Sequence, residues 1–385
     1  MNERVVCVMA RMLDQDDGLG VYARNLLDHM LPMDTCSRYL ILLRTDKHAS
    51  TFAHHPNADV RVLPAKIKTV WDQVVVPLAA RRENADVIFN PKFSVPLLSR
   101  RAATFVLQGS DWYINPQNYE WWDNLYIRLM LPLYCRKADR LLAISHSVID
   151  DLLPRLALNA AAITVSYAAP ASHFVAHRDQ AAVSRFRTEY GLPERFVFTV
   201  ARAYHTGHGR MPPYAGGNNV RLIRAYRRYV EQGGTLPLVV AGHEIERYLR
   251  QQGFDDRALA GVHFTGFIPH DRIHMGYQLA ELFVLATLNE SFAFPLAEAL
   301  ACGCPAIVPR TGACPEIGGD AVRLIDPYDT ADIAAALTEI ATSAEQRMKL
   351  RRAGLRRIKQ FSWQETARHT LAVFEAIAPR RTVPA

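Results

Sequence analysis

Two glutamates with seven residues between them are the strongest sign of chemistry in the sequence. Glu290 and Glu298 stand in the stretch 289–305, NESFAFPLAEALACGCP. Two carboxylates at one site can form the acid/base pair of a glycoside hydrolase, which flanks the scissile bond from opposite walls. Here one loop and the helix after it carry both, which favours binding of sugar hydroxyls. A third interpretation places Glu298 on the solvent face of an early helical turn, where negative charge is favourable.

Both glutamates belong to a predicted unit of strand, loop, helix and strand. The apolar run 282–286 predicts a buried strand, and 304–309 predicts the next one. Pro295 suits the first position of the helix between them, and Gly303 suits the position just past its end. Ligands of open parallel sheets bind at the carboxyl ends of strands. A helix start there also offers unpaired backbone N–H groups to an anion such as phosphate.

A glycine-containing stretch, 199–217, follows another predicted strand and carries four cationic or titratable side chains. They are Arg202, His205, His208 and Arg210. A nucleotide diphosphate needs cations, and arginine makes bidentate contacts with phosphate. The two histidines could also bind a metal, but no third ligand is apparent, so we predict no metal site.

Two further glycine-containing turns are candidates for close approach to a ligand. In 262–269, VHFTGFIP, a strand ends at Gly266, and the backbone after it is free to contact a planar base. Gly18 and Gly20 flank one leucine in a loop between the first predicted strand and a helix over 21–30. Glycine lets a backbone approach closely. An ordinary tight turn explains either segment equally well.

The order of the predicted elements indicates an α/β protein with two doubly wound, Rossmann-like domains. A chain of 385 residues is too long for one ordinary core. Strands and helices alternate through residues 1–170 and again through 171–365, which is typical of parallel sheets covered by helices. The predicted strands are 4–10, 39–43, 60–63, 86–89, 104–107, 140–145 and 163–167, and then 196–200, 238–241, 262–265, 282–286, 306–308 and 321–324.

The composition is that of a globular protein without a nucleic-acid-binding tail or a membrane-spanning segment. The chain is 49% hydrophobic and 22% charged, as in ordinary soluble proteins, and its net charge of +7 is spread over both halves. It therefore has no nucleic-acid-binding tail, although anionic small molecules or lipid surfaces suit it. Its six cysteines are scattered, no secretory signal is visible, and no apolar run approaches the ~18 residues of a membrane span. We expect a cytoplasmic protein. Seven basic residues in 347–359 predict a solvated helix face or a lipid contact.

The stretch with the two glutamates resembles the signature of the retaining glycosyltransferases of family 4 (group 1 glycosyltransferases). Their pattern is E-G/S-F-G-x-P-x-x-E-A-x-A-x-G-x-P-V, and ESFAFPLAEALACGCPA is similar to it. The resemblance covers nearly the whole chain in the right order. Further matches are Gly-Leu-Gly at 18–20, Gly-Phe-Ile-Pro at 266–269, Pro-Glu at 315–316, Asp-Pro at 326–327 and Phe-Ser-Trp at 361–363.

The resemblance implies the GT-B fold, in which two Rossmann-like domains face a central cleft. Residues 1–170 would be the acceptor-side domain, with a final helix at about 366–385 packed back on it, and 171–365 would bind a nucleotide sugar. Glu298 would bind the ribose hydroxyls, and Glu290 would contact the donor sugar. The other implied donor contacts are Ala293, Phe294 and Leu296 for sugar and phosphates, Gly266, Phe267 and Ile268 for the base, and Gly20, Arg202, Arg210 and Asn218 for the diphosphate.

Two positions depart from the family pattern. Gln108 stands where the family has a catalytic-site histidine, so it can donate a hydrogen bond but cannot carry a proton. Asn218 stands where the family has a lysine on the diphosphate. Losing that cation should weaken leaving-group stabilisation by roughly 1.5–4 kcal/mol, unless Arg210, His208 or Arg221 replaces it.

The predicted activity is retaining transfer of a hexose or deoxyhexose, mannose-type favoured, to a glycan or lipid-linked acceptor in surface polysaccharide synthesis. A GDP-sugar is the favoured donor and a UDP-sugar the alternative. No metal, other cofactor or nucleic acid is expected, and peripheral contact with the inner membrane face is compatible with this activity. The departures at Gln108 and Asn218 keep two alternatives open, a catalytically weakened binding protein or complex subunit and a nucleotide-sugar epimerase.

Overall fold

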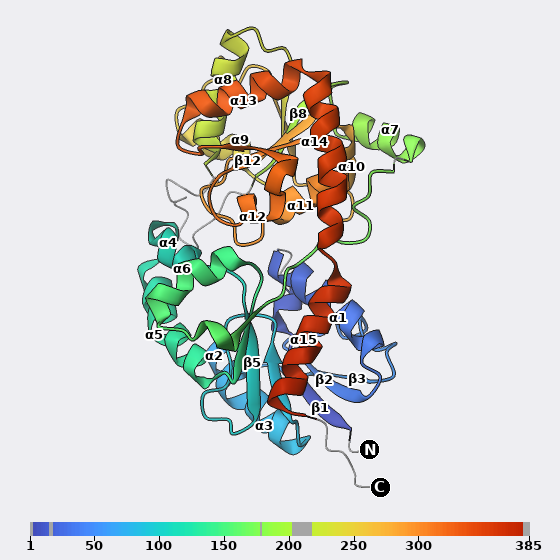
Figure 1. Ribbon diagram of the computed structural model, residues 1–385, viewed down its shortest axis with the longest axis vertical. Helices are drawn as coiled ribbons and strands as arrows, with labels where there is room; N and C mark the ends of the chain where they lie inside the picture. The colour runs from blue at the N-terminus through green and yellow to red at the C-terminus, as the bar shows by residue number, and fades with distance from the viewer. Residues whose placement is uncertain (1–2, 15–17, 178, 202–217, 380–385) are drawn as a thin grey trace. The chain divides into compact units, whose positions relative to one another are not determined.

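The computed structural model describes residues 3–14, 18–177, 179–201 and 218–379. The chain forms two compact units (Figure 1). Unit 1 comprises Met1–Tyr113, Trp121–Ala168 and Phe361–Ala385, and unit 2 comprises Ile114–Glu120 and Ala169–Gln360. The predicted boundary at residue 170 lies within two residues of the division after Ala168.

Unit 1 is built on a parallel sheet in the order β3-β2-β1-β4-β5-β6-β7. The chain reverses its direction of travel between β1 and β4, as in a doubly wound domain. The apolar runs that predicted β1, β2, β4, β5 and β6 are mostly buried in the structure, whereas the outer strands β3 and β7 are only partly buried. The strands are β1 (Arg4–Met9), β2 (Ser37–Leu43), β3 (Ala58–Val62), β4 (Val87–Asn90), β5 (Ala102–Leu107), β6 (Arg140–Ala143) and β7 (Ile163–Val165).

The helices of unit 1 differ from the predictions mainly at their starts. The predicted Gly-Leu-Gly loop is wrong, because Gly18 and Gly20 form the first turn of α1 (Gly18–Met33). The helix predicted over 74–82 begins earlier, as α2 (Lys68–Val70), a π-helical turn η2 (Trp71–Val75) and α3 (Val76–Arg82). Its β-branched and aromatic residues favour strands and hide the start. The remaining helices are α4 (Asp111–Ile114), α5 (Trp121–Lys137), α6 (His146–Leu156) and α15 (Trp363–Ile377).

Unit 2 repeats the design with the parallel order β10-β9-β8-β11-β12-β13. The predicted doubly wound α/β architecture is thus confirmed in both units. The strands are β8 (Val197–Val200), β9 (Leu238–Ala241), β10 (Val262–Gly266), β11 (Leu282–Val284), β12 (Ala306–Pro309) and β13 (Val322–Ile325). The helices are α7 (Gln180–Glu189), α8 (Asn219–Glu231), α9 (Ile245–Gln251), α10 (His274–Leu279), α11 (Phe294–Ala301), α12 (Cys314–Gly318), α13 (Thr330–Thr342) and α14 (Ala344–Arg357).

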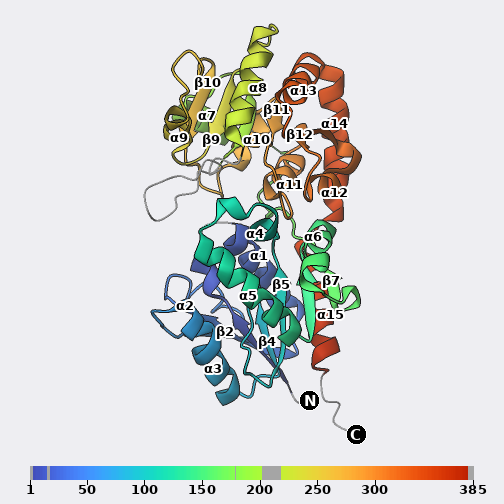
Figure 2. The same cartoon turned by 90° about the vertical axis from the view of Figure 1, so that its left-hand side faces the viewer.

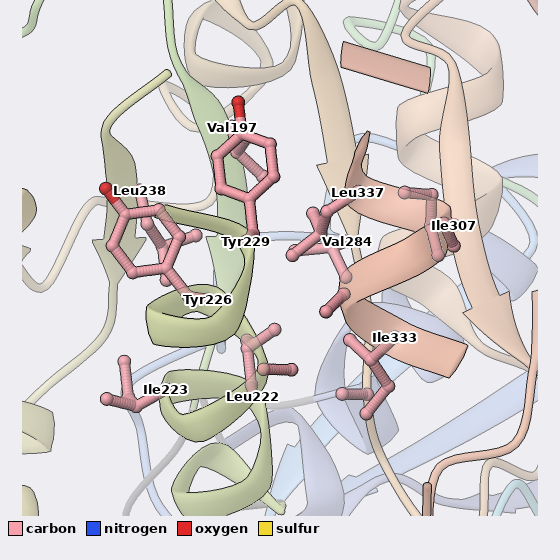
Figure 3. Close-up of a cluster of buried hydrophobic side chains, with 14 of the residues drawn as sticks. Val197, Leu222, Ile223, Tyr226, Tyr229, Leu238, Val284, Ile307, Ile333 and Leu337 are labelled. Carbon is pink, nitrogen blue, oxygen red and sulfur yellow. The ribbon is translucent and has the colours of Figure 1, made fainter. Parts of the chain in front are cut away.

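A core of buried side chains fixes two helices of unit 2 on its sheet. Tyr226 and Tyr229 of α8 lie against the strand residues Val197 and Leu238, and Leu337 of α13 lies beside Val284 of β11 (Figure 3). Burial of large apolar side chains of this kind contributes about 1.5–3 kcal/mol each. The sheet edge that follows β8 and β11 is therefore built on a rigid base.

The basic run 347–359 lies mostly on α14, where several of its side chains serve the unit's own structure. Arg351 donates to the carbonyl of Gly303 at 3.0 Å, and Arg357 donates to the carbonyl of Ile317 at 3.0 Å. Arg347 forms an ion pair with Glu281 at 3.1 Å. Among the described residues, no helix is long and apolar enough to cross a membrane.

An ion cluster centred on the buried Arg4 ties the last helix of unit 1 to its first strand. Arg4 of β1 contacts Asp34 at 3.3 Å and Glu375 of α15 at 2.9 Å. The hydroxyl of Tyr39 donates to the same Asp34 carboxylate at 2.7 Å. The ring of Trp363, at the start of α15, packs edge-on against Tyr22 of α1, with centroids 5.4 Å apart. The C-terminal helix therefore belongs to the fold of unit 1.

We predict that Arg4→Ala lowers the free energy of unfolding of unit 1 by about 3–5 kcal/mol, because it leaves the buried Asp34 carboxylate without its cation. Arg368→Ala is the matched control: Arg368 pairs with Glu365 on the exposed face of α15, where such a pair contributes less than about 1 kcal/mol. Urea titration followed by tryptophan fluorescence measures both, since all five tryptophans lie in unit 1. Equal effects of the two substitutions would contradict the prediction.

Candidate functional site

The candidate site of unit 2 forms where its chain reverses direction across the sheet. β8 and β11 are neighbours, and the chain travels outward from them in opposite directions, so the carboxyl ends of these two strands lie together at one edge. The connection after β11 carries Glu290, and α11, which follows it, carries Glu298. The sequence predicted this placement of both glutamates.

The loop that carries Glu290 is held by the loop after β12. The backbone N–H of Ala313 donates to the carbonyl of Glu290 at 2.8 Å, and the hydroxyl of Thr311 donates to the carbonyl of Leu288 at 2.8 Å. Gly312 has φ of +57°, and a Cβ there would lie 2.6 Å from the carbonyl oxygen of Glu290. Only glycine allows so close an approach in that conformation. Gly312 therefore sets the position of the Glu290 backbone.

The start of α11 is reached through a left-handed residue that is not glycine. Ala293 has φ of 60° and ψ of 59° and is buried. This conformation costs an alanine about 1–2 kcal/mol. The helix begins at Phe294, one residue before the predicted Pro295, and its first internal hydrogen bond runs from the N–H of Ala297 to the carbonyl of Ala293. The N–H groups of Phe294 and Leu296 precede that bond, so the helix's own ladder does not use them.

Glu298 is a buried carboxylate held by two donors. Its side chain is nearly inaccessible, and the residue is 6% exposed, which makes the solvent-face interpretation wrong. Oε1 accepts from Nε2 of His270 at 3.0 Å, and Oε2 accepts from the hydroxyl of Tyr277 at 3.1 Å. Burial, reinforced by the Glu298 charge, raises the pKa of Tyr277, so its phenol stays protonated and donates.

His270 is itself held in place by neighbouring rings. Nε2 of His173 donates to the His270 carbonyl at 3.1 Å, and the two imidazoles meet edge-on with centroids 5.5 Å apart. The ring of Phe174 lies 5.2 Å from that of His270. Burial lowers the pKa of His173, which keeps its imidazole neutral near pH 7. The proton on His270 Nε2 is thus directed to Glu298, and through it the segment after β10 is joined to α11.

The segment predicted to border a base lies just before His270. Gly266 ends β10 with φ of +72° and open space where a Cβ would be. The ring of Phe267 is 63% exposed, whereas Ile268 is buried. The exposed aromatic face and the adjacent backbone are therefore the groups in this segment that can contact a planar ligand.

The side chain of Asn218, at the start of α8, is used in hydrogen bonds within unit 2. It adopts the left-handed conformation, with φ of 68°. Its amide donates to the carbonyl of Ala286 at 2.7 Å and to that of Pro327 at 2.8 Å, and its oxygen accepts from Arg221 at 2.8 Å. Both amide hydrogens are used, so the side chain has none left for a phosphate. Asn218 instead links the chain after β11 to the chain after β13.

Two of the predicted site residues belong to unit 1. Gln108 follows β5, is buried, and donates through its amide to the carbonyl of Pro91. Gly20 is buried in the first turn of α1. Arg202 and Arg210, with His205 and His208, lie outside the described residues. Within the described part of the chain, no group of three His, Cys, Asp or Glu side chains could hold a metal ion.

The sequence alone did not predict the partners of Glu298. His270 directly follows the Gly-Phe-Ile-Pro segment, but nothing in its spacing indicates that the chain returns to α11 there. Tyr277 lies on the short helix α10, whose apolar pattern indicates burial only. Nothing in the sequence around Gly312 indicated that it would contact the backbone of Glu290.

Comparison with known proteins relates part of the chain to one family. Residues 209–357 match the family model described as Glycosyl transferases group 1. The serotype-specific mannosyltransferase WbdA of Escherichia coli is 26% identical over 237 residues, which are 60% of this chain and 28% of WbdA. The O-antigen chain mannosyltransferase B of Escherichia coli is 26% identical over 171 residues, or 41% and 43% of the two chains. The chain thus spans less than half the length of these curated relatives.

Solved structures agree with the fold over nearly the whole chain. A glycosyltransferase from Rickettsia africae superposes with a TM-score of 0.73 at 12% identity, covering 98% of this chain and 99% of its own. The Anabaena protein HepE, solved in complex with UDP and glucose, superposes with a TM-score of 0.71 at 15% identity, covering 97% and 100%. At such identities the likeness concerns the fold, and that fold is GT-B.

We predict that Gly312→Ala lowers the free energy of unfolding by about 2–4 kcal/mol, because strain at positive φ adds to the clash with the Glu290 carbonyl. Gly253→Ala is the matched control, since Gly253 also has positive φ (+87°) but no atom lies within 4 Å of the added Cβ. The control should lose only about 1–2 kcal/mol. Calorimetric melts of the two variants measure these losses. Equal losses of unfolding free energy would show that the contact of Gly312 with the Glu290 carbonyl adds nothing to the strain of its positive φ.

Proposed function

We propose that this chain, which has the GT-B fold, is a group 1 glycosyltransferase that transfers a sugar from a nucleotide sugar with retention of anomeric configuration. The observation that carries this proposal is the buried Glu298 carboxylate, held by His270 and Tyr277 beside the start of α11. An acceptor-only group pre-oriented at a helix start suits a ligand with hydroxyls next to phosphates.

The chemistry of Glu298 fits a ribose. An ionised carboxylate offers about four acceptor positions, and His270 and Tyr277 occupy one on each oxygen. The remaining position on each oxygen can accept from one hydroxyl of a vicinal diol. Two donors hold the carboxylate in place before a ligand arrives, so less conformational entropy is lost on binding.

The diphosphate and the sugar would be bound by the groups ahead of Glu298. The N–H groups of Phe294 and Leu296 and the positive end of the α11 dipole favour an anion. Arg202 and Arg210 are the proposed cations. Glu290, whose backbone Ala313 and Gly312 position, is the proposed contact to the donor sugar. Stabilisation of the departing diphosphate by such fixed groups needs no metal ion, and we propose a metal-independent reaction without other cofactors.

The favoured donor is GDP-mannose or a related GDP-sugar, and the acceptor a glycan or lipid-linked glycan of a surface polysaccharide. The names of the relatives WbdA and O-antigen chain mannosyltransferase B support mannose and this class of acceptor. A UDP-sugar is the alternative donor, because HepE was solved with UDP. A lipid-linked acceptor would bring the protein to the inner face of the membrane from the cytoplasm.

A second candidate function is binding of a nucleotide sugar without efficient transfer, as a subunit of a glycan-assembly complex. The specific observation behind it concerns Asn218, at the position of the family's lysine. Its amide donates both hydrogens to the carbonyls of Ala286 and Pro327. Gln108, at the position of the family's histidine, likewise donates to Pro91. Both departures remove a group that could carry charge or a proton.

We predict that one nucleotide sugar in a panel of GDP-, UDP-, dTDP- and ADP-sugars raises the Tm of the wild type, because a ligand of the native state stabilises it. Glu298→Gln should bind that donor about 10- to 100-fold more weakly, since hydrogen bonds to charged groups contribute about 1.5–3 kcal/mol. Glu339→Gln, an exposed glutamate paired with Arg323, should bind it like wild type.

Turnover of the same donor separates the two candidate functions. Transfer or hydrolysis with retained configuration, followed by proton NMR in the presence of EDTA, supports the transferase. Donor binding without turnover favours the binding subunit. Unimpaired donor binding by Glu298→Gln would overturn the proposed site in either case.

We further predict that His270→Ala raises the KM for the donor about tenfold with little change in kcat, because His270 positions Glu298 for binding rather than for the chemical step. His270→Gln, which keeps an N–H donor for Oε1, should recover most of the loss. His274→Ala is the matched control: this ring lies 5.5 Å from His173 in the same cluster, but Glu298 is bound by His270 and Tyr277. A purely structural role would lower Tm in all three variants and leave KM unchanged.

A further inference from the structure

Helix α5 of unit 1 presents large apolar side chains to solvent. Six of them are between 42% and 69% exposed: Trp121, Trp122, Leu125, Tyr126, Leu129 and Leu133. Four recur every four residues, which places them in one stripe along the helix. The opposite side of α5 carries the buried Ile127 and Leu131. A helix of a soluble protein normally turns its apolar stripe inward, so this outward stripe needs a partner.

The neighbouring helical segment, 68–82, carries a second outward stripe. Ile67, Val70, Val74 and Leu78 are exposed and recur at spacings of three and four residues. Trp71 and Val76 of the same segment are buried against the sheet. The outward side chains therefore do not contribute to the hydrophobic core of unit 1.

The helices that carry the two stripes cover the same face of the unit 1 sheet. Right-handed crossovers put the helices that connect β3 to β4 and β5 to β6 on one face of the sheet, and α1, which connects β1 to β2, on the other. Figures 1 and 2 both show α5 beside α2. Burial chiefly raises the pKa of Tyr134 on α5, and the Asp72 charge in the 68–82 segment adds to this rise, as expected for adjacent helices. We call the ten exposed side chains the outer apolar face.

The charged residues around the outer apolar face are mainly basic. Lys66, Lys68, Arg81 and Arg82 are exposed along the 68–82 segment, and Arg128 and Arg136 are exposed on α5. Asp72 of that segment is buried and paired with Arg11 at 2.9 Å. The exposed acidic residue on α5 is Asp123. Aromatic rings with apolar bodies and polar tips, rimmed by cations, suit the interface of an anionic bilayer.

We propose that the outer apolar face docks unit 1 on an anionic lipid bilayer, with Trp121 and Leu129 entering the interface and the lysines and arginines contacting lipid headgroups. The proposal deepens the proposed function, on which it rests for a lipid-linked acceptor. A second copy of the chain fits less well, because a two-fold contact through this face would set its cations against each other.

Co-sedimentation of the full chain with vesicles tests the proposal without donor or acceptor. We predict that the chain binds vesicles of phosphatidylcholine that contain about 30% of the anionic lipid phosphatidylglycerol. Binding should be weaker to vesicles of phosphatidylcholine alone, and weaker at high salt. The double variant Trp121→Ser/Leu129→Ser should partition at least about tenfold more weakly, because less apolar area enters the interface. Its circular dichroism melt and its donor-induced Tm shift should match wild type, so that failure of docking and failure of the proposed reaction are distinguished.

Two controls on α14 of unit 2 sharpen the test. Met348→Ser removes a 48%-exposed apolar side chain from a basic helix and should leave vesicle binding unchanged. Arg352→Gln/Arg356→Gln removes two exposed cations of that helix and should change it little. The proposal is overturned by absent vesicle binding, by equal binding of the Trp121/Leu129 variant, or by a loss confined to the α14 variant. Light scattering showing a wild-type dimer that the Trp121/Leu129 variant dissociates would assign the face to a second copy instead.

Discussion

Burying a carboxylate is costly unless its oxygens receive hydrogen bonds, and this constraint organises the site of unit 2. Glu298 lies on α11, and the donors that it needs come from His270, in the chain after β10, and from Tyr277 on α10. The ring of Tyr277 also packs edge-on against Phe198 and Phe283, so apolar burial as well as the bond to Glu298 holds α10 in place. Glu298 thus links both segments to α11, and the rings of His173 and Phe174 pack on His270 and hold its imidazole beside the carboxylate.

The parallel sheet supplies the rest of the geometry. Chain reversal between β8 and β11 leaves the ends of these two strands side by side, and the connection after β11 leads into the start of α11. The loop after β12 then fixes the loop after β11, through Gly312 and the Ala313 N–H. Groups that bind charge are thus held by strands and by main-chain hydrogen bonds rather than by flexible side chains, which is what pre-organisation of a ligand site requires.

The architecture could be predicted from the sequence because its signals are local. Apolar runs of strand length marked every strand of both sheets to within a few residues, and glycine or proline bounded some of them. The glutamate pair could be located because both residues follow one strand. The bonds of Glu298 could not be predicted, since His270 and Tyr277 are brought to it by tertiary folding. Gly18 and Gly20 were misassigned because two glycines favour a loop locally, whereas packing of Tyr22 and Leu26 in the core extends α1 over them.

Asn218, where the sequence resemblance implies a lysine, has a backbone explanation. Helices α8, α9 and α11 each start after a left-handed residue: Asn218, Glu244 and Ala293. Asparagine tolerates that conformation better than lysine, because its short amide can hydrogen-bond nearby backbone. Asn218 does so with the carbonyls of Ala286 and Pro327, which would lose both donors if it were replaced by an apolar side chain. The start of α8 is therefore well satisfied by Asn218, and in the proposed function the positive charge for a diphosphate comes from other residues.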